Sequence, residues 1–167
     1  MISIYKTLEE DFVTLDKIEE GCWITAIRPS EEELCRLEEE TGIDIDDLRA
    51  PLDDEERSRI ELEDGYTMIL VDIPSLDEKD RYVTIPLGIY MTKEHIVTVC
   101  LEETPVLKAF ESRRVREFYT FKKTRFVFQI LYRNAVSYLR YLRIIDRKSD
   151  QIEEKLHISQ KNSELIE

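Results

Sequence analysis

The chain has 167 residues, a length that fits one domain or one domain with an appendage. Apolar residues make up 42% of it and charged residues 37%, and its four glycines and five prolines argue against a disordered linker protein. The net charge of −13 is uneven: residues 1–64 carry 22 acidic and 7 basic side chains, whereas residues 108–148 carry 12 basic and 3 acidic ones. The first part therefore repels nucleic acid. The basic part has no recognised nucleic-acid motif, so we interpret it as a solvated or subunit-contacting helix face.

The cysteines and histidines exclude two common kinds of site. Cys22, Cys35 and Cys100 show no Cys-x-x-Cys spacing, and no signal peptide precedes them, so free thiols in a reducing cytosol are expected. His95 and His157 are too far apart in the sequence to indicate a histidine-rich metal site. No apolar run reaches the roughly 18 to 20 residues that a membrane-spanning helix needs.

The chain is expected to open with two strands and a helix. Residues 2–7 and 22–30 have the composition of strands. Ser30, followed three residues later by Glu33, forms a capping box that starts a helix. Gly42 follows the apolar positions of this helix and suits the left-handed conformation that ends it.

Residues 43–66 combine short helical turns with the start of a sheet. Residues 43–50 predict a short helix, and Pro51, a residue favoured in a first turn, predicts another single turn. From residue 57 the apolar period changes to two, which is typical of a strand. Asp64 followed by Gly65 is a strong signal for a hairpin turn into the next strand.

Three further strands complete an antiparallel or mixed sheet. Residues 67–74, 82–91 and 95–101 have this pattern, and the second of them places its apolar side chains on one face. Pro86 and Gly88 lie on the opposite face of that strand. They indicate either an edge position or a close approach of another part of the backbone.

Two helices are predicted after the sheet. Thr104 and Pro105 suit the cap and first turn of a helix that runs to about Arg114. A second helix over about 123–157 would be about 50 Å long at roughly 1.5 Å per residue, too long for a domain of this size to cover. Its heptad-like seam predicts partner helices from the same chain or another subunit. The seam consists of Phe128, Leu131, Ala135, Tyr138, Leu142, Ile145, Ser149, Ile152 and Leu156.

Signals for catalysis are weak. The sequence has no phosphate-binding loop, nucleophile elbow, zinc-protease motif or dinucleotide fingerprint. His95 at the start of a strand fits a surface or hydrogen-bonded histidine better than a catalytic one. We therefore predict that the protein is not an enzyme and keep a hydrolase only as the last alternative.

The acidic run over residues 53–56 has two interpretations. Carboxylates are ligands of hard cations such as Mg²⁺, which suggests a divalent-cation site. Acidic runs are also commonly solvated, and acids near a helix start are stabilised by its dipole by roughly 0.3 to 1 kcal/mol each. Composition alone favours the solvated surface.

The succession of elements resembles a known family. The acidic run leads into Arg57-Ser58-Arg59-Ile60-Glu61, then Asp64-Gly65-Tyr66 and the strand TMILVDIP. The strand ending His95-Ile96-Val97-Thr98-Val99, a proline-led helix and a long helix follow. This order, over roughly residues 1–160, resembles the cytoplasmic amino-terminal domain of the CorA-type magnesium/cobalt transporter family. Ser58 stands where that family usually has proline.

The resemblance implies an α/β/α sandwich with a mixed central sheet, followed by a long C-terminal helix. It divides the chain into a cytosolic domain over residues 1–120 and a helical stalk region that starts over residues 121–167. It further implies a homopentameric transporter of the cell membrane with this part on the cytoplasmic side. The family's Gly-Met-Asn motif and transmembrane helices are absent from the sequence. The chain is therefore expected to contribute to assembly and gating and not itself to transport ions.

The resemblance also implies a regulatory Mg²⁺ site between subunits. The residues assigned to it here are Asp46, Asp47, Asp53 and Asp54. Arg49 and Ala50 occupy the positions where the family commonly has Glu and Asp, so Asp47 is at best a displaced substitute, and Mg²⁺ is not expected to be required for folding.

Two alternatives to a magnesium or cobalt transporter stay open. One is a zinc- or nickel-directed member of the same family, because the residues that select the ion lie in the missing membrane part. The other is an acidic interaction module that self-associates through the 123–157 helix.

Overall fold

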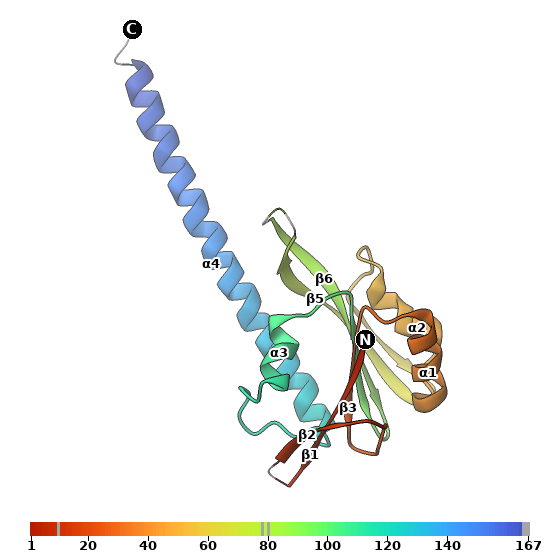
Figure 1. The fold of residues 1–167 in the computed structure, drawn as a ribbon. Helices are drawn as coiled ribbons and strands as arrows, with labels where there is room; N and C mark the ends of the chain where they lie inside the picture. Colours follow the sequence, from red (N-terminus) through yellow and green to blue (C-terminus); the bar gives the residue numbers. More distant parts are fainter. Residues whose placement is uncertain (10, 78, 80, 165–167) are drawn as a thin grey trace.

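A computed structural model describes residues 1–9, 11–77, 79 and 81–164 (Figure 1). Within these residues, seven strands form one sheet. The strands are β1 (Ile2–Leu8), β2 (Asp11–Leu15), β3 (Trp23–Ile27), β4 (Arg59–Glu63), β5 (Tyr66–Leu76), β6 (Tyr82–Thr92) and β7 (Ile96–Cys100). The helices in the same residues are α1 (Glu31–Thr41), α2 (Ile45–Arg49), the 3-10 turn η1 (Ala50–Leu52), α3 (Pro105–Glu111) and α4 (Lys123–Glu164).

The sheet is mixed, as the sequence predicted. Its strand order is β2-β1-β3-β7-β6-β5-β4, and the pairing of β3 with β7 is parallel while the other pairings are antiparallel. After the long segment that follows β3, the chain therefore returns to place β7 directly beside β3. β2 was not predicted: only five residues long, it has no buried side chain and pairs only with β1, so its sequence carries little apolar signal.

The helices cover both faces of the sheet and make the predicted α/β/α sandwich. Figure 1 shows α1 and α2 on one side of the sheet and α3 and the start of α4 on the other. On the first side, Leu34, Leu37 and Leu48 from the helices pack with sheet residues such as Met68 and Val97 in one buried cluster. Because β3 is buried on both faces, its alternate side chains join two different cores.

The second core is rich in aromatic side chains. Trp23 of β3 packs with Phe110 of α3 and Phe126 of α4, with ring centroids 6.3 and 5.1 Å from the indole. The indole N–H of Trp23 donates to Thr98 Oγ1 at 2.9 Å, so this buried polar group has a partner. These contacts fix the first turns of α4 against the sheet.

The local signals around α1 are confirmed. Ser30 accepts from the backbone N–H of Glu33, and the Glu33 side chain accepts from the backbone N–H of Ser30. Gly42 ends the helix in the left-handed region, at φ 71°. Thr104 caps α3 in a similar way, although α3 ends at Glu111 and not near Arg114.

Gly88 marks a close approach and not an edge. β6 lies between β5 and β7 inside the sheet. A Cβ built at Gly88 would lie 2.7 Å from the Tyr90 hydroxyl and 2.8 Å from Cγ of Pro51 in η1. Of the two alternatives raised by the sequence, the edge position is wrong, and the close approach is made by side chains and not by another part of the backbone.

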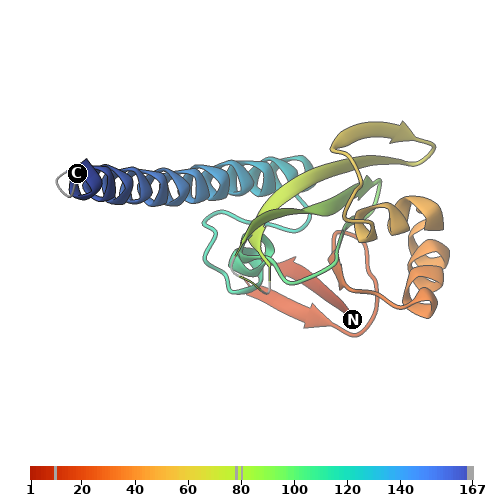
Figure 2. The ribbon, with the colours of Figure 1, turned by 90° about the horizontal axis from the view of Figure 1, so that it is seen from above.

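α4 packs on the sheet in a register that differs from the predicted seam. The buried residues of its first turns are Phe126, Val127 and Ile130, whereas Phe128 is 66% exposed. The apolar residues of the exposed part of the helix follow the heptad spacing. The buried face of the first turns is rotated about the helix axis relative to that seam, because Phe126 packs in the aromatic core. Figures 1 and 2 show the rest of the helix leaving the body.

Four apolar side chains of the outer part of α4 form what we call the distal strip: Leu142, Ile145, Ile152 and Leu156. Their exposed fractions range from 39 to 58%. Spacings of three, seven and four residues place them on one side of the helix. As predicted, the helix outruns the body of this chain and leaves apolar residues uncovered.

Candidate functional site

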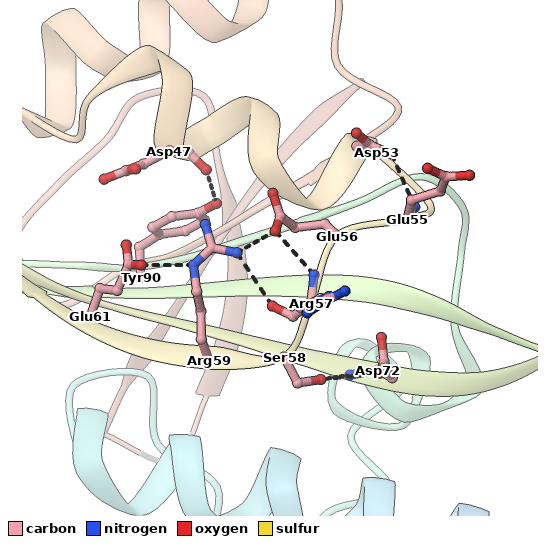
Figure 3. A network of polar contacts seen from close by, with 10 residues as sticks. All are labelled: Asp47, Asp53, Glu55, Glu56, Arg57, Ser58, Arg59, Glu61, Asp72 and Tyr90. Carbon is pink, nitrogen blue, oxygen red and sulfur yellow. Dashed lines mark hydrogen bonds and ion pairs between the residues drawn. The ribbon is translucent and has the colours of Figure 1, made fainter.

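The acidic segment, which we define as residues 44–64, lies along the α1 side of the sheet and continues into its β4 edge (Figure 3). Asp44 starts α2 by accepting from the backbone N–H of Asp46 at 2.8 Å. Pro51 then opens η1 and is buried against the sheet. The short helices thus place their carboxylates along the outside while their apolar residues face the core.

Two tyrosines of the sheet hold Asp47. The Tyr90 hydroxyl donates to the backbone carbonyl of Asp47 at 2.5 Å, and the Tyr66 hydroxyl donates to its carboxylate (Figure 3 shows the first contact). Burial raises the pKa of both tyrosines, and their proximity to Asp47 raises it further. Both hydroxyls therefore stay protonated and keep donating to Asp47.

Asp46 forms an ion pair with an arginine side chain of the same helix. Arg49 Nη1 lies 2.8 Å from Asp46 Oδ1, and Arg49 Nη2 lies 2.6 Å from Glu31 Oε2 on α1. The hydrogen bond from Arg49 lowers the pKa of the Glu31 carboxyl. Arg49, at the position where the resemblance expects an acid, thus links α1 to α2 through two carboxylates.

The acidic run over residues 53–56 forms a turn, and an arginine that follows it pairs with one of its acids. Asp53 accepts from the backbone N–H of Glu55 at 3.0 Å. Arg59 pairs with Glu56 and with Glu61, the second at 2.8 Å (Figure 3). Asp54 is exposed. Arg59 therefore neutralises part of the run, and Asp53, Asp54 and Glu55 are exposed to water.

The four aspartates assigned to a metal site are not gathered in a single chain. In the parts of the chain that the structure describes, no group of three or more acidic, histidine or cysteine side chains is arranged to hold a metal ion. Asp46 and Asp47 are used in contacts within the chain, whereas Asp53 and Asp54 are exposed. Because the site was predicted between subunits, it stays a prediction.

Sequence reasoning missed the residues that hold the segment in place. Tyr66 and Tyr90 lie on strands at positions facing α2, and their hydroxyls reach Asp47 in the middle of this short helix. An aromatic residue next to the Asp64-Gly65 turn was the available signal for Tyr66. His95, in contrast, is placed as expected: it is buried and lies 3.7 Å from Cys22 Sγ, and its backbone N–H donates to Thr92 Oγ1.

The cysteines and the helices of the described residues complete the description. Cys22, Cys35 and Cys100 are free thiols in the structure. Burial raises the pKa of Cys100 to about 11, so this thiol stays protonated and unreactive at neutral pH. Among the helices of the described residues, none combines the length and the apolar character required to cross a bilayer.

Comparison with known proteins assigns the family. The model of the family described as CorA-like Mg²⁺ transporter protein matches residues 19–167. A cobalt/magnesium transport protein CorA from Methanocaldococcus jannaschii is 29% identical over 143 residues, which are 80% of this chain and 43% of that protein. The chain thus spans less than half the length of this relative.

Solved structures show the same fold. The structure of the soluble domain of CorA from Methanocaldococcus jannaschii is 26% identical, with a TM-score of 0.79 over 93% of this chain and 64% of that one. The complete CorA magnesium transporter from the same organism is 24% identical and superposes with a TM-score of 0.78, over 93% of this chain and 51% of that one.

The predicted resemblance and the expectation of a non-enzyme are therefore confirmed. The family model covers most of the sequence, and the matched residues include all the helices and the strands from β3 to β7 described above. The chain belongs to the CorA-like Mg²⁺ transporter family, a family of transporters and not of enzymes.

Proposed function

We propose that the chain forms the cytoplasmic part of a divalent-cation transporter, where it assembles with identical copies and contributes to gating without transporting ions itself. Membership of the family supports the transporter, and its similarity to the soluble domain of a CorA supports the cytoplasmic placement. The observation that carries the assembly role is α4, which leaves the body with the distal strip exposed.

The distal strip favours a protein partner on physical grounds. Exposed apolar surface in water is unfavourable by about 25 cal/mol per Å², and a single-sided strip on a helix is the pattern of helix packing. Leu142 and Ile152 are each more than half exposed, so packing against another helix would remove much of this surface from water. The proposal assigns this contact to helices of neighbouring subunits.

Exchange of domains between relatives tests the transport role. A chimera would be made in which this chain replaces the matching segment of the CorA of Methanocaldococcus jannaschii. Uptake of Mg²⁺, Co²⁺, Zn²⁺ and Ni²⁺ would then be measured in vesicles that contain the chimera. Uptake of Mg²⁺ or Co²⁺ by vesicles with the chimera, and not by vesicles without it, supports the proposal. A correctly inserted chimera without transport of any of these ions contradicts it. Because ion selection belongs to the membrane part, the Zn²⁺ and Ni²⁺ measurements use a chimera with a zinc-directed membrane part for comparison.

We further propose that the acidic segment faces a neighbouring copy and that Mg²⁺ there regulates assembly. Residues 1–64 have a large excess of acids, and like charges on facing surfaces repel each other unless cations lie between them. Asp46, Asp47, Asp53 and Asp54 are the residues assigned to this contact. Loss of Mg²⁺ would then favour separation of the copies and a different state of the pore.

The regulatory role is tested by following the melting temperature of the chain during titration with Mg²⁺. A rise in the melting temperature together with a larger sedimenting species supports sensing by the acidic segment. Exchanging the four aspartates for asparagine should abolish the response. A melting temperature that does not move up to tens of millimolar Mg²⁺ removes the sensor role from this chain.

A second candidate function rests on the same helix. The chain would be an acidic interaction module that pairs with itself through the 123–157 part of α4, without a membrane-bound pore. Sedimentation that shows a stable dimer in the absence of Mg²⁺, combined with inactive chimeras, would favour this candidate over the transporter.

A further inference from the structure

The outer edge of strand β4 is open. β4 is the last strand of the sheet and pairs only with β5, from Arg59 opposite Leu70 to Glu63 opposite Tyr66. Within the described residues, no hydrogen bond reaches the backbone groups on its other edge. A row of unpaired N–H and C=O groups is a template for a further strand, which proteins usually block with charges, bulges or a covering segment. The side chains of β4 therefore decide which strand can pair with it.

One face of β4 carries apolar side chains that are exposed to water. Ile60 and Leu62 are 68% and 83% exposed, and Leu62 is the most exposed large apolar side chain in the described part of the protein. Because they are two residues apart on a strand, both lie on the same face. Ile69, the partner of Ile60 on β5, is buried in the second core. Ile60 and Leu62 therefore extend the apolar face of the sheet up to its open edge.

The other face of β4 carries charges of both signs. Arg59, Glu61 and Glu63 alternate with the two apolar residues. Arg59 Nε lies 2.8 Å from Glu61 Oε1, and a second nitrogen of Arg59 pairs with Glu56. Glu63 has no ion-pair partner within the residues described. The strand thus has opposite charges at its two ends, an apolar residue next to each end and an acid in the middle.

We propose that β4 pairs antiparallel with β4 of a second copy of the chain, about a two-fold axis at Glu61. All five residues of each strand are then paired. Arg59 lies opposite the partner's Glu63, and Ile60 lies opposite the partner's Leu62. Opposite charges and apolar pairs directly across antiparallel strands are stabilising. The two Glu61 carboxylates meet at the axis, where each already has the Arg59 of its own chain at 2.8 Å.

The side chains select this direction and this register. A parallel arrangement in register would place arginine opposite arginine and acid opposite acid, and like charges directly across from each other are destabilising. A shift of the antiparallel pair by one residue would place apolar residues opposite charged ones. A shift by two residues in either direction would shorten the paired stretch by two residues. The strand is therefore complementary to a second copy of itself.

This inference rests on the proposed contact of the acidic segment with a neighbouring copy, because β4 belongs to that segment. It adds the groups that make the contact: the backbone edge and the apolar pairs hold the copies together. Mg²⁺ would offset the repulsion that remains between the exposed acids of residues 53–55. A two-fold contact closes with two copies, so it is separate from association through α4.

Cross-linking at the axis tests the register. In a Cys35→Ser background, which removes the exposed thiol, Glu61→Cys should form a disulfide-linked dimer with oxidised glutathione, because side chains directly across from each other have Cβ atoms ~5 Å apart. Glu63→Cys is the matched control. Its two thiols would be offset along the strands by roughly 14 Å, too far for a disulfide. The linked fraction should be at least tenfold larger for Glu61→Cys.

Sedimentation equilibrium tests the apolar pair. The measurement uses the Leu142→Gln, Ile145→Gln background, so that the distal strip does not contribute. Leu62→Lys should weaken dimerisation at least tenfold and leave the melting temperature of the single chain unchanged, because Leu62 is exposed there. Leu8→Lys, at another exposed apolar position, is the control and should leave dimerisation unchanged.

Equal cross-linking at positions 61 and 63, or none at position 61, would overturn the proposal. Dimerisation that Leu62→Lys leaves unchanged would also overturn it. A melting temperature that responds to Mg²⁺ in a chain that does not cross-link at position 61 would retain Mg²⁺ sensing and reject the pairing of β4. Cross-linking at position 61 that persists when the four aspartates of the acidic segment are exchanged for asparagine would support the pairing, whether or not Mg²⁺ changes the melting temperature.

Discussion

Gly88 shows how one residue positions the acidic segment. Its missing side chain makes room for Pro51 and for the ring of Tyr90, and the Tyr90 hydroxyl in turn holds the carbonyl of Asp47. The turn η1 and the middle of α2 therefore contact strand β6 directly. A side chain at position 88 would displace both contacts at once.

Gly88→Ala should destabilise the fold by about 1 to 3 kcal/mol, because the new methyl group would overlap with Pro51 and the Tyr90 hydroxyl. The measurement is the free energy of unfolding in urea. Thr84→Ala, at an exposed position of the same strand, is the control and should change stability much less. Equal effects of the two substitutions would show that the close approach does not constrain the strand.

His95 gives the fold a pH dependence. It is 5% exposed, and burial lowers its pKa from the usual value near 6.5, against the opposing charge of Glu94. The folded state therefore binds this proton less readily than the unfolded chain. The stabilisation from neutral His95 is complete above about pH 6.5 and is lost as the pH falls from there towards the lowered pKa of the folded state.

The expected result is a fall in melting temperature from pH 7 to pH 5 that His95→Gln makes shallower. His157→Gln, on the exposed part of α4, serves as the control and should retain the pH dependence of the unsubstituted chain. If His95→Gln and the unsubstituted chain lost stability in parallel over this range, His95 would not be the group that titrates.

At the scale of elements, local sequence specifies α1 almost completely. The capping box at its start and Gly42 at its end satisfy backbone groups that a helix leaves unpaired. These interactions span only a few residues, so they are readable from the sequence without knowledge of the fold.

Ser30→Ala should lower the free energy of unfolding by about 1 kcal/mol, since it removes the side chain that accepts from Glu33. Chemical denaturation measures the change. Ser149→Ala, on the exposed length of α4, is the matched control and should cause no loss. A loss at position 149 as large as that at position 30 would argue against a specific contribution of the cap.

The elements that the sequence did not predict depend on contacts between distant segments. β2 is a strand because β1 lies beside it, and its own residues are too few and too exposed to show a period. The rotation of α4 is set by Trp23 and Phe110, which are far from Phe126 in the sequence. Similarly, the candidate site could be located by its acidic run, whereas Tyr90 and Arg49, which organise it, act through tertiary contacts.

At the scale of the whole molecule, charge and apolar surface are segregated. The acids lie mainly in residues 1–64, which supply α1, α2 and the acidic segment, whereas five arginines and the distal strip lie on α4. Copies of the chain can therefore meet through unlike charges and through apolar contact together. The two contributions respond differently to salt, because only the first is screened.

Self-association through α4 should be measurable by sedimentation equilibrium. Leu142→Gln combined with Ile145→Gln should weaken it at least tenfold, because both side chains belong to the distal strip and are exposed in the single chain. Arg143→Gln, between them on another side of the helix, should have a smaller effect that disappears at high salt. A monodisperse monomer at high concentration for the unsubstituted chain would exclude strong association through this helix.

The parallel pairing of β3 with β7 also sets the order in which the chain can fold. β1, β2 and β3 are made first, yet they join the remaining strands only through β7, whose last residue is Cys100. During synthesis more than seventy further residues must be added after residue 27 before β3 can pair with β7 and the sheet becomes continuous. Trp23 can pack against Phe126 only after still more of the chain has been made. Such distant pairings make folding slow and leave strand edges open meanwhile. The concentrated negative charge of residues 1–64 makes unfinished chains repel one another, which opposes pairing between open strand edges before the sheet is complete.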